Sequence, residues 1–173
     1  MKIELAKTEV IHFVGIGGIG MSGLSLIMKA KGFKIQGSDL NLNKNVERLK
    51  KEKIKVFIGQ KKQNLKNATI IVISSAIKKN NPEMIEAKRK NLPIITRGKM
   101  LAHIVSLTKN IVVVGSHGKT TTTSLIASIF QKTKLDPTII NGGVINSIRN
   151  TARLGKSDWS ILEADESDGS FLK

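Results

Sequence analysis

The sequence predicts an α/β protein built on parallel sheets, and three observations lead to that prediction. Apolar runs of strand length recur along the 173 residues, segments with helical spacing lie between most of them, and each of two glycine-rich loops directly follows an apolar run. Unbroken apolar strands are typical of parallel sheets that helices cover on both faces. The composition, 40% hydrophobic but only 3% aromatic, predicts a core made mainly of Ile, Val and Leu.

The expected strands are short and strongly apolar, and they lie at residues 10–14, 33–36, 55–58, 69–73, 93–96 and 111–114. Helices are expected between several of them. The first, residues 19–31, ends at Gly32, which suits a left-handed C-cap. Another follows Pro82, because proline is favoured at the first helical position. A third, residues 99–107, carries its apolar side chains on one side.

The chain carries a formal net charge of +16, which would suit a nucleic-acid binder. Much of the excess lies in residues 44–66, where lysines alternate with acidic and apolar residues as on a solvated surface, without aromatic rings to stack bases. A lysine-rich surface around an anionic-ligand site is therefore preferred. The sequence has no cysteine, no signal-peptide apolar region and no transmembrane-length apolar run, so a cytoplasmic protein without nucleic-acid or membrane partners is expected.

The first glycine-rich loop lies between an expected strand and an expected helix. Residues 15–20 satisfy G-x-G-x-x-G, in which a tight turn brings backbone amides against a diphosphate at the helix N-terminus. Asp39, just past the second strand, could accept a hydrogen bond from a ribose hydroxyl. Alone, this pattern predicts either a binding site for NAD or glycines that merely allow close packing of the strand and the helix. Ser74 and Ser75 end another strand at the expected ligand crevice, or serve only as turn residues.

The second loop, GSHGKTTTT at residues 115–123, looks like an ATP-binding P-loop with a shortened spacing. Only Ser116 and His117 separate its first glycine from the Gly-Lys pair. Lys119 can neutralise the β- and γ-phosphates, and the Thr120 hydroxyl can ligate Mg²⁺. A polar helix cap would explain the threonines, but it would not explain Gly-Lys-Thr after an apolar strand.

A short apolar strand, residues 159–162, leads into an acidic stretch that begins at Glu163. Carboxylates at a strand end can hold Mg²⁺ beside a nucleotide, although an acidic loop is often only solvated. This strand and the one before the second loop are expected to be parallel neighbours, which would bring the Glu163 carboxylate, metal and phosphate together. His12, His103 and Trp159 are interpreted as packing or surface residues.

Several motifs in this order resemble the Mur ligases of peptidoglycan synthesis, whose ATP loop is the shortened G-[ST]-[HN]-G-K-T-T. The resemblance covers nearly all of the chain. It rests on GIGGIGMSG at 15–23, SDL at 38–40, SSAI at 74–77, RGKMLAHI at 97–104, NGG at 141–143 and EADESDGSF at 163–171. Ser116 stands where threonine is usual and Gly169 where alanine is common, and both are small changes.

The resemblance implies a Rossmann-like first domain, residues 1–107, that binds the UDP portion of a sugar substrate instead of NAD. Its UDP-sugar-binding residues would be Gly15, Gly17, Gly18, Gly20, Asp39, Ser74 and Ser75. Residues 108–173 would begin a P-loop-type α/β ATPase domain, with ATP bound by Gly115, Ser116, His117, Gly118, Lys119, Thr120 and Thr121. Lys119 and Glu163 would be catalytic, and Thr120 and Glu163 would ligate Mg²⁺.

The implied activity is the ATP-dependent addition of L-alanine to UDP-N-acetylmuramate through an acyl phosphate. EADESD followed by Ser170 and Phe171 favours this reaction over that of the ligases that recycle muropeptides. The rest of the ATPase domain and the family's amino-acid-binding domain would follow Lys173, so this chain is expected to be an incomplete, inactive fragment. Two alternatives are a non-catalytic UDP-sugar-binding module and an NAD-dependent oxidoreductase, but an oxidoreductase has no use for Gly-Lys-Thr.

Overall fold

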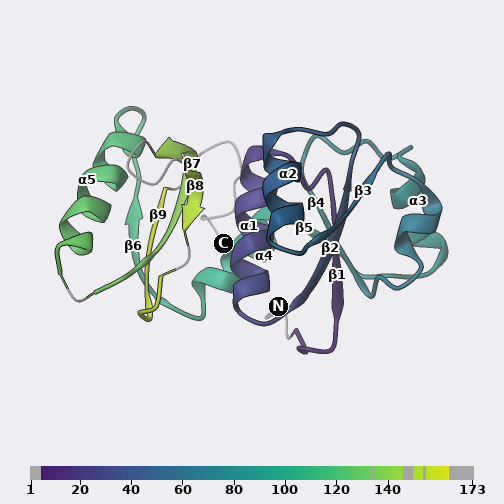
Figure 1. Cartoon of the computed structure of the whole chain (residues 1–173), viewed down its shortest axis with the longest axis horizontal. Coiled ribbons are helices and arrows are strands. Elements are labelled where there is room, and N and C mark those ends of the chain that lie inside the picture. Colours follow the sequence, from purple (N-terminus) through teal and green to yellow (C-terminus); the bar gives the residue numbers. More distant parts are fainter. Residues whose placement is uncertain (1–4, 134, 146–149, 154, 164–173) are drawn as a thin grey trace. The chain divides into compact units, whose positions relative to one another are not determined.

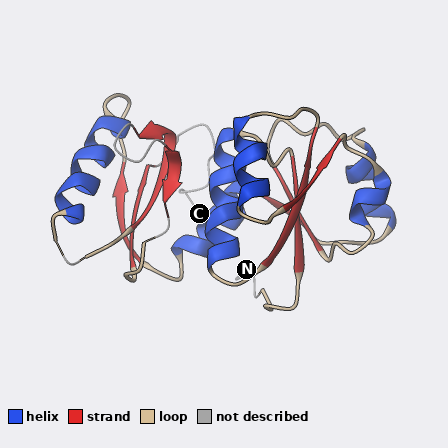
Figure 2. Ribbon diagram, in the orientation of Figure 1, coloured by secondary structure: helices blue, strands red, loops and turns tan. Residues whose placement is uncertain are grey.

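The computed structural model describes residues 5–133, 135–145, 150–153 and 155–163. The chain divides into two compact units, Met1–Met100 and Leu101–Lys173, and each contains its own sheet and helices (Figures 1 and 2). The division falls within helix α4 (Arg97–Val105), which continues directly from strand β5. The domain boundary expected after residue 107 lies beyond the end of this helix and stays a prediction.

The first unit is built on a five-stranded parallel sheet with the order β3-β2-β1-β4-β5. Its strands are β1 (Val10–Val14), β2 (Lys34–Asp39), β3 (Lys55–Ile58), β4 (Ile70–Ile73) and β5 (Ile94–Thr96). The carboxyl ends of the central strands are level, because Val14 of β1 is paired with Ser38 of β2 and with Ile73 of β4. The parallel sheet predicted from the apolar runs is therefore confirmed.

Helices cover both faces of this sheet. Helices α1 (Ile19–Ala30) and α2 (Lys44–Lys51) lie on one face, and η1 (Lys62–Leu65) and α3 (Pro82–Arg89) lie on the other (Figure 1). Gly32 follows α1 with a φ of +89°, as expected for a left-handed glycine after a helix. The lysine-rich segment 44–66 contains α2 and η1, and α2 buries Val46 and Leu49 in the first unit.

The core of the first unit forms where the strands and these helices meet. Val14, Leu65, Ala68, Ile71 and Ala87 form one cluster of buried apolar side chains. On the neighbouring strand, a Cβ atom added to Gly37 would lie 2.6 Å from the carbonyl oxygen of Phe13 and from a methyl carbon of Ile16. This close approach of β2 to β1 excludes any side chain at Gly37, and it sets the position of the chain that follows β1.

The second unit contains a four-stranded sheet with the order β6-β9-β7-β8. Strands β6 (Lys109–Val113), β9 (Trp159–Glu163) and β7 (Thr138–Ile145) are parallel, whereas β8 (Asn150–Arg153) pairs antiparallel to β7. Helix α5 (Lys119–Gln131) packs Ala127 against Ile139 and Ile161. The sequence did not predict β7 and β8, because β7 contains an Asn-Gly-Gly stretch and β8 begins at an Asn, and both residue types are uncommon in strands.

Within the part of the chain that the structure describes, no helix is both long and apolar enough to cross a membrane.

Candidate functional site

The glycine-rich loop of the first unit lies at the point where the strand order reverses. The chain runs from β1 outward to β2 and β3, and then crosses to β4 and β5 on the other side of β1. In open parallel sheets, ligands bind outside the carboxyl ends of the strands at this switch point. The loop after β1 and Ser74-Ser75 after β4 both lie there, and a Cβ at Gly15 would be 3.4 Å from the side chain of Ile77. Ser74 is half-buried and Ser75 is exposed.

The backbone of this loop is folded tightly onto the end of β2. Gly15 has a φ of +75°, and the N–H groups of Gly15 and Ile16 both donate to the carbonyl oxygen of Ser38, at 2.8 and 2.9 Å. The N–H of Gly18 donates to the carbonyl oxygen of Gly15 at 3.1 Å. The loop is thus held in one conformation before helix α1 begins, and its position depends on Ser38.

Asp39 contacts the loop through its carboxylate. Its Oδ2 accepts a hydrogen bond from the N–H of Gly17 at 2.8 Å, and its Oδ1 accepts one from the N–H of Asn41 at 3.3 Å. A Cβ at Gly17 would lie 2.7 Å from Val46 and 2.8 Å from both Asn43 and Asp39. The structure therefore gives Asp39 a role in shaping the loop, and its contact with a ribose hydroxyl stays a prediction.

Sequence reasoning did not single out Arg97 as a site residue, but it lies beside the start of α1. A Cβ added to Gly20 would overlap Nη1 of the Arg97 guanidinium. The N-terminus of a helix attracts anions, and a guanidinium beside it adds a full positive charge and planar donors for phosphate. The available signal was the position of Arg97 immediately after strand β5, at the carboxyl edge of the parallel sheet.

The second glycine-rich loop connects β6 to α5. Gly115 has a φ of +150°, and Gly118 has a φ of +75° as the N-cap of α5. The Lys119 ammonium donates to the carbonyl oxygen of Gly115 at 2.5 Å, which folds the lysine side chain back over the loop. Ser116, His117 and Thr121, also predicted to bind ATP, are all exposed at this end of the unit. These residues are close together in the structure, and their binding role stays a prediction.

Thr120 and Glu163 come together at the carboxyl edge of the second sheet. Strands β6 and β9 are parallel neighbours, with Val113 paired to Glu163. Across this edge, the Thr120 hydroxyl lies 3.1 and 3.2 Å from the two carboxylate oxygens of Glu163. Residues 43 positions apart are therefore brought into direct contact, as the expected pairing of these strands requires.

A hydroxyl and a carboxylate in contact are a suitable donor set for Mg²⁺. This ion prefers oxygen ligands in an octahedral arrangement, and it often takes only one or two protein ligands beside waters and phosphates. Among the described residues, no group of three or more His, Cys, Asp or Glu side chains is placed to hold a metal ion. Asp165, Glu166 and Asp168 of the acidic stretch lie outside the described residues. Thr120 and Glu163 thus fit a magnesium site completed by nucleotide and water.

Comparisons with known proteins found a matching family profile and similar sequences. A family profile described as "Mur ligase family, catalytic domain" matches residues 10–109. The UDP-N-acetylmuramate–L-alanine ligase of Pelagibacter ubique (strain HTCC1062) is 77% identical over 172 residues, which cover 99% of this chain and 37% of that protein. The chain therefore spans little more than a third of the length of this relative.

Two solved structures resemble the chain in fold as well as in sequence. The UDP-N-acetylmuramate:L-alanyl-gamma-D-glutamyl-meso-diaminopimelate ligase from Neisseria meningitides is 31% identical with a TM-score of 0.82, covering 92% of this chain and 53% of that one. The UDP-N-acetylmuramate–alanine ligase MurC from Thermotoga maritima is 29% identical with a TM-score of 0.77, covering 88% of this chain and 36% of that one.

Proposed function

Because the chain belongs to the Mur ligase family, we propose that its two units supply the UDP-sugar site and the ATP site of a ligase that joins L-alanine to UDP-N-acetylmuramate. The observation that carries this proposal is the contact of Thr120 with Glu163 beside a Gly-Lys-Thr loop. The 77% identity to a UDP-N-acetylmuramate–L-alanine ligase supports the choice of substrates. The chain spans 37% of the length of this relative, so the activity is proposed for a protein of the relative's full length.

The second unit would bind ATP and activate the acceptor. A carboxylate is a poor electrophile, so an oxygen of the lactyl carboxylate first attacks the γ-phosphorus of ATP, and ADP leaves. The amine of L-alanine then attacks the acyl carbon, loses a proton and expels phosphate, which leaves an amide. Lys119 would neutralise charge on the phosphates during the transfer, and Gly118 would allow the backbone to approach them. Mg²⁺, held by Thr120 and Glu163, would neutralise phosphate charge when bound.

The first unit would bind the UDP portion of the sugar substrate. The diphosphate would lie against the first turn of α1, beside Gly20 and the Arg97 guanidinium. Ser74 and Ser75 lie across the switch point from this turn, where side chains reach a bound nucleotide in parallel α/β proteins. Because ATP and the UDP-sugar are cytoplasmic metabolites, the proposed reaction takes place in the cytoplasm.

A muropeptide-recycling ligase is the second candidate, because the Neisseria meningitides relative, with a TM-score of 0.82, is named as a ligase that joins UDP-N-acetylmuramate to a peptide instead of a single amino acid. The sequence identity separates the two candidates more clearly than the fold does. The chain is 31% identical to that relative but 77% identical to the L-alanine ligase of Pelagibacter ubique. L-alanine is therefore the proposed amino-acid substrate.

Calorimetric titration of the 173-residue chain tests the nucleotide assignment. UDP-N-acetylmuramate, UDP, NAD and ADP-ribose would be titrated in parallel, with ADP-ribose as the control for a diphosphate that lacks uridine. We expect UDP-N-acetylmuramate and UDP to bind at least tenfold more tightly than NAD and ADP-ribose, a difference of about 1.4 kcal/mol. Tighter binding of NAD than of the UDP-sugar would overturn the assignment of the first unit.

A further inference from the structure

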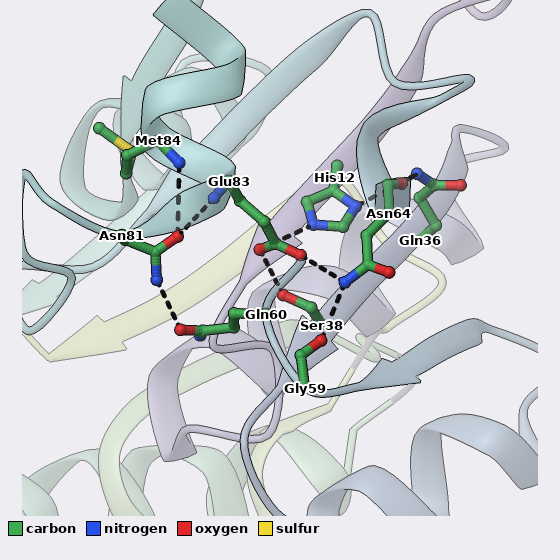
Figure 3. Close-up of polar contacts among 9 residues, drawn as sticks. All are labelled: His12, Gln36, Ser38, Gly59, Gln60, Asn64, Asn81, Glu83 and Met84. Atoms are coloured by element: carbon green, nitrogen blue, oxygen red, sulfur yellow. Dashed lines mark hydrogen bonds and ion pairs between the residues drawn. The ribbon is translucent and has the colours of Figure 1, made fainter. Parts of the chain in front are cut away.

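A cluster of polar side chains is buried in the core of the first unit (Figure 3). Its members come from β1, β2, η1 and α3, and each is at most 8% exposed: His12, Gln36, Ser38, Asn64 and Glu83. Buried polar groups destabilise a fold unless hydrogen bonds satisfy them, and a buried carboxylate requires several donors. The cluster therefore needs an explanation beyond packing.

Glu83 is the acceptor at the centre of this cluster. The Ser38 hydroxyl donates to its Oε2 at 2.6 Å, the Asn64 amide donates to its Oε1 at 2.6 Å, and His12 Nε2 lies 3.4 Å from Oε2. Glu83 also lies in the first turn of α3, where the helix dipole favours a negative charge. Its side chain is fully buried. These contacts hold the carboxylate in one position against the end of β2.

The hydrogen bonds of the cluster are consistent with only one arrangement of donors. The Gln36 amide nitrogen donates to the carbonyl oxygen of Asn64 at 3.0 Å, and the same nitrogen lies 3.2 Å from His12 Nδ1. A carbonyl oxygen can only accept, so the Gln36 amide cannot be flipped, and Nδ1 of His12 must accept as well. The proton of a neutral His12 is then on Nε2, facing Glu83. No member can reorient without losing a bond.

This cluster is connected to the glycine-rich loop through Ser38. The hydroxyl of Ser38 donates to Glu83, while its carbonyl oxygen accepts from the N–H groups of Gly15 and Ile16. The next residue, Asp39, accepts from the N–H of Gly17. Three consecutive loop amides therefore depend on the last two residues of β2.

A second connection runs through the chain that follows β3. The carbonyl oxygen of Asp39 accepts from the N–H of Gly59 at 2.7 Å, and the carbonyl oxygen of Gly59 accepts from the Asn64 amide at 2.9 Å. Asn64 in turn donates to Glu83. The end of β2 is thus linked to Glu83 from both sides.

We infer that Glu83 is a positioning residue for the UDP diphosphate, and that it acts through Ser38 on the glycine-rich loop. The inference rests on the proposed function of the first unit. Glu83 touches no ligand in this scheme. Its carboxylate fixes the end of β2, the end of β2 orients the amides of Gly15, Ile16 and Gly17, and the loop presents the first turn of α1 to the diphosphate.

Replacement of the carboxylate by an amide tests this inference with little change in shape. In Glu83→Gln, one oxygen becomes an NH₂ group, so a donor then faces either the Asn64 amide or the Nε2–H of His12, and in the second case the Ser38 hydroxyl also loses its acceptor. Either mismatch loosens the end of β2. We expect the Kd for UDP-N-acetylmuramate to rise about tenfold, and hydrogen exchange to accelerate at the amides of Gly15, Ile16 and Gly17.

Two variants of helix α3 are matched controls. Glu86→Gln removes the same charge one turn further along, where the carboxylate pairs with the exposed Arg89 instead of the core. Ala87→Gly weakens the same helix at a buried position that belongs to the apolar cluster of the unit. Both controls are expected to keep the Kd and the exchange rates of the loop amides within twofold of the parent chain.

Ser38→Ala removes the hydroxyl that donates to Glu83, and it leaves the Ser38 carbonyl in place for the loop amides. If the two residues act on the loop together, the double variant binds UDP-N-acetylmuramate no more weakly than the weaker single variant. If Glu83→Gln does not fold, the single variant Ser38→Ala tests the inference in its place. Independent, additive losses from the two substitutions would overturn the inference.

Calorimetry and NMR hydrogen exchange of the 173-residue chain would be measured for all five variants and the parent. A Kd within twofold of the parent for a folded Glu83→Gln would overturn the inference, and so would an equal loss in Ala87→Gly. If the parent chain does not bind the UDP-sugar, the proposed function fails instead. The exchange rates of the ligand-free loop then still decide whether Glu83 positions it.

Discussion

The two glycine-rich loops of this chain follow parallel strands in the same way, but they are held by different contacts. In the first unit, the amides of Gly15 and Ile16 donate to the Ser38 carbonyl, and the amide of Gly17 donates to the Asp39 carboxylate. In the second unit, the described contacts of the loop are fewer, and the Lys119 ammonium closes it onto the Gly115 carbonyl. The first loop is thus shaped by its surroundings, and the second largely by its own backbone.

This difference shows that glycine is required for different reasons in the two loops. A Cβ at Gly17 would be within 2.8 Å of three neighbouring side chains, whereas a Cβ at Gly118 meets no described atom within 4 Å. Gly118 instead has a φ of +75°, a conformation that side chains disfavour even in open space. Glycine is thus required in the first loop by the neighbouring side chains, and in the second loop by the conformation of its own backbone.

The largest effect is expected from Lys119, which is the charged group of the second loop. In a full-length ligase that includes this sequence, Lys119→Ala should lower the rate of ATP-dependent ligation about 10²- to 10³-fold, because charge on the transferring phosphoryl group is no longer neutralised. Binding of the UDP-sugar should be unchanged. Single-turnover assays of the variant and its parent would measure the loss, and retention of more than about a tenth of the rate would exclude this role.

Gly17→Ala tests whether the first loop is shaped by its surroundings. The added methyl group would collide with Val46, Asn43 and Asp39, so we expect a loss of about 1–3 kcal/mol in the free energy of unfolding, as for other overpacked sites. The affinity for the UDP-sugar should fall as well. Urea denaturation followed by circular dichroism would measure the stability, and a loss below about 0.5 kcal/mol would contradict the described packing.

Hydrogen exchange would compare the two units directly. The described core of the second unit centres on Ala127, Ile139 and Ile161, while Leu125 and Ile129 of α5 are 61% and 64% exposed. We therefore expect backbone amides in β6 and β9 to exchange at least about tenfold faster than those in β1 and β4, because less apolar surface protects them from local opening. Equal protection in the two sheets would show that the second unit is as stable as the first.

Gly118→Ala should have a smaller effect than Gly17→Ala, because backbone strain is its main cause. An L-residue in the left-handed region costs about 1–2 kcal/mol, and asparagine tolerates this region better than alanine. The matched variant Gly118→Asn should therefore retain more stability than Gly118→Ala. Thermal unfolding of the two variants and the parent would rank them, and a reversed order would mean that a steric contact limits this position.

The smallest effect concerns His103 in the second unit. Burial lowers the pKa of His103 below its ordinary value of 6.5, because desolvation disfavours the charged imidazolium. The stabilising contribution of the neutral side chain is thus present above the unfolded pKa, and it is lost as the pH falls through the lower folded value. His103→Gln should slightly flatten the loss of stability between pH 7 and pH 5, as measured by urea denaturation of the variant and the parent at both pH values.

The fold could be predicted from the sequence where apolar runs are unbroken. Strands β1 and β3 begin and end at the expected residues. Each is a short run with little alternation between apolar and polar side chains, and glycine or polar residues follow the strand. Strand β6 begins at Lys109 instead of residue 111, because pairing with Trp159 on β9 draws polar residues into the ladder. Helix α2 was missed, because its short apolar pattern of Val46 and Leu49 is surrounded by lysines.

The candidate site was predictable where local spacing determines geometry. The position of Thr120 opposite Glu163 follows from two loops at the ends of adjacent parallel strands. The contacts of Asp39 and Glu83 could not be predicted, because they depend on how three loops meet at the edge of the first sheet. Sequence patterns indicate which edge of a sheet a residue reaches, but not which of several donors it binds there.

The register of β6 and β9 restricts how the sequence of β9 can change during evolution. The two strands pair residue for residue from Lys109 and Trp159 to Val113 and Glu163. Side chains alternate between the faces of a strand, so one inserted or deleted residue between Trp159 and Glu163 would turn the carboxylate away from Thr120. Substitutions within β9 can therefore accumulate while its length stays constant, and insertions among related proteins are expected in the connection before Trp159.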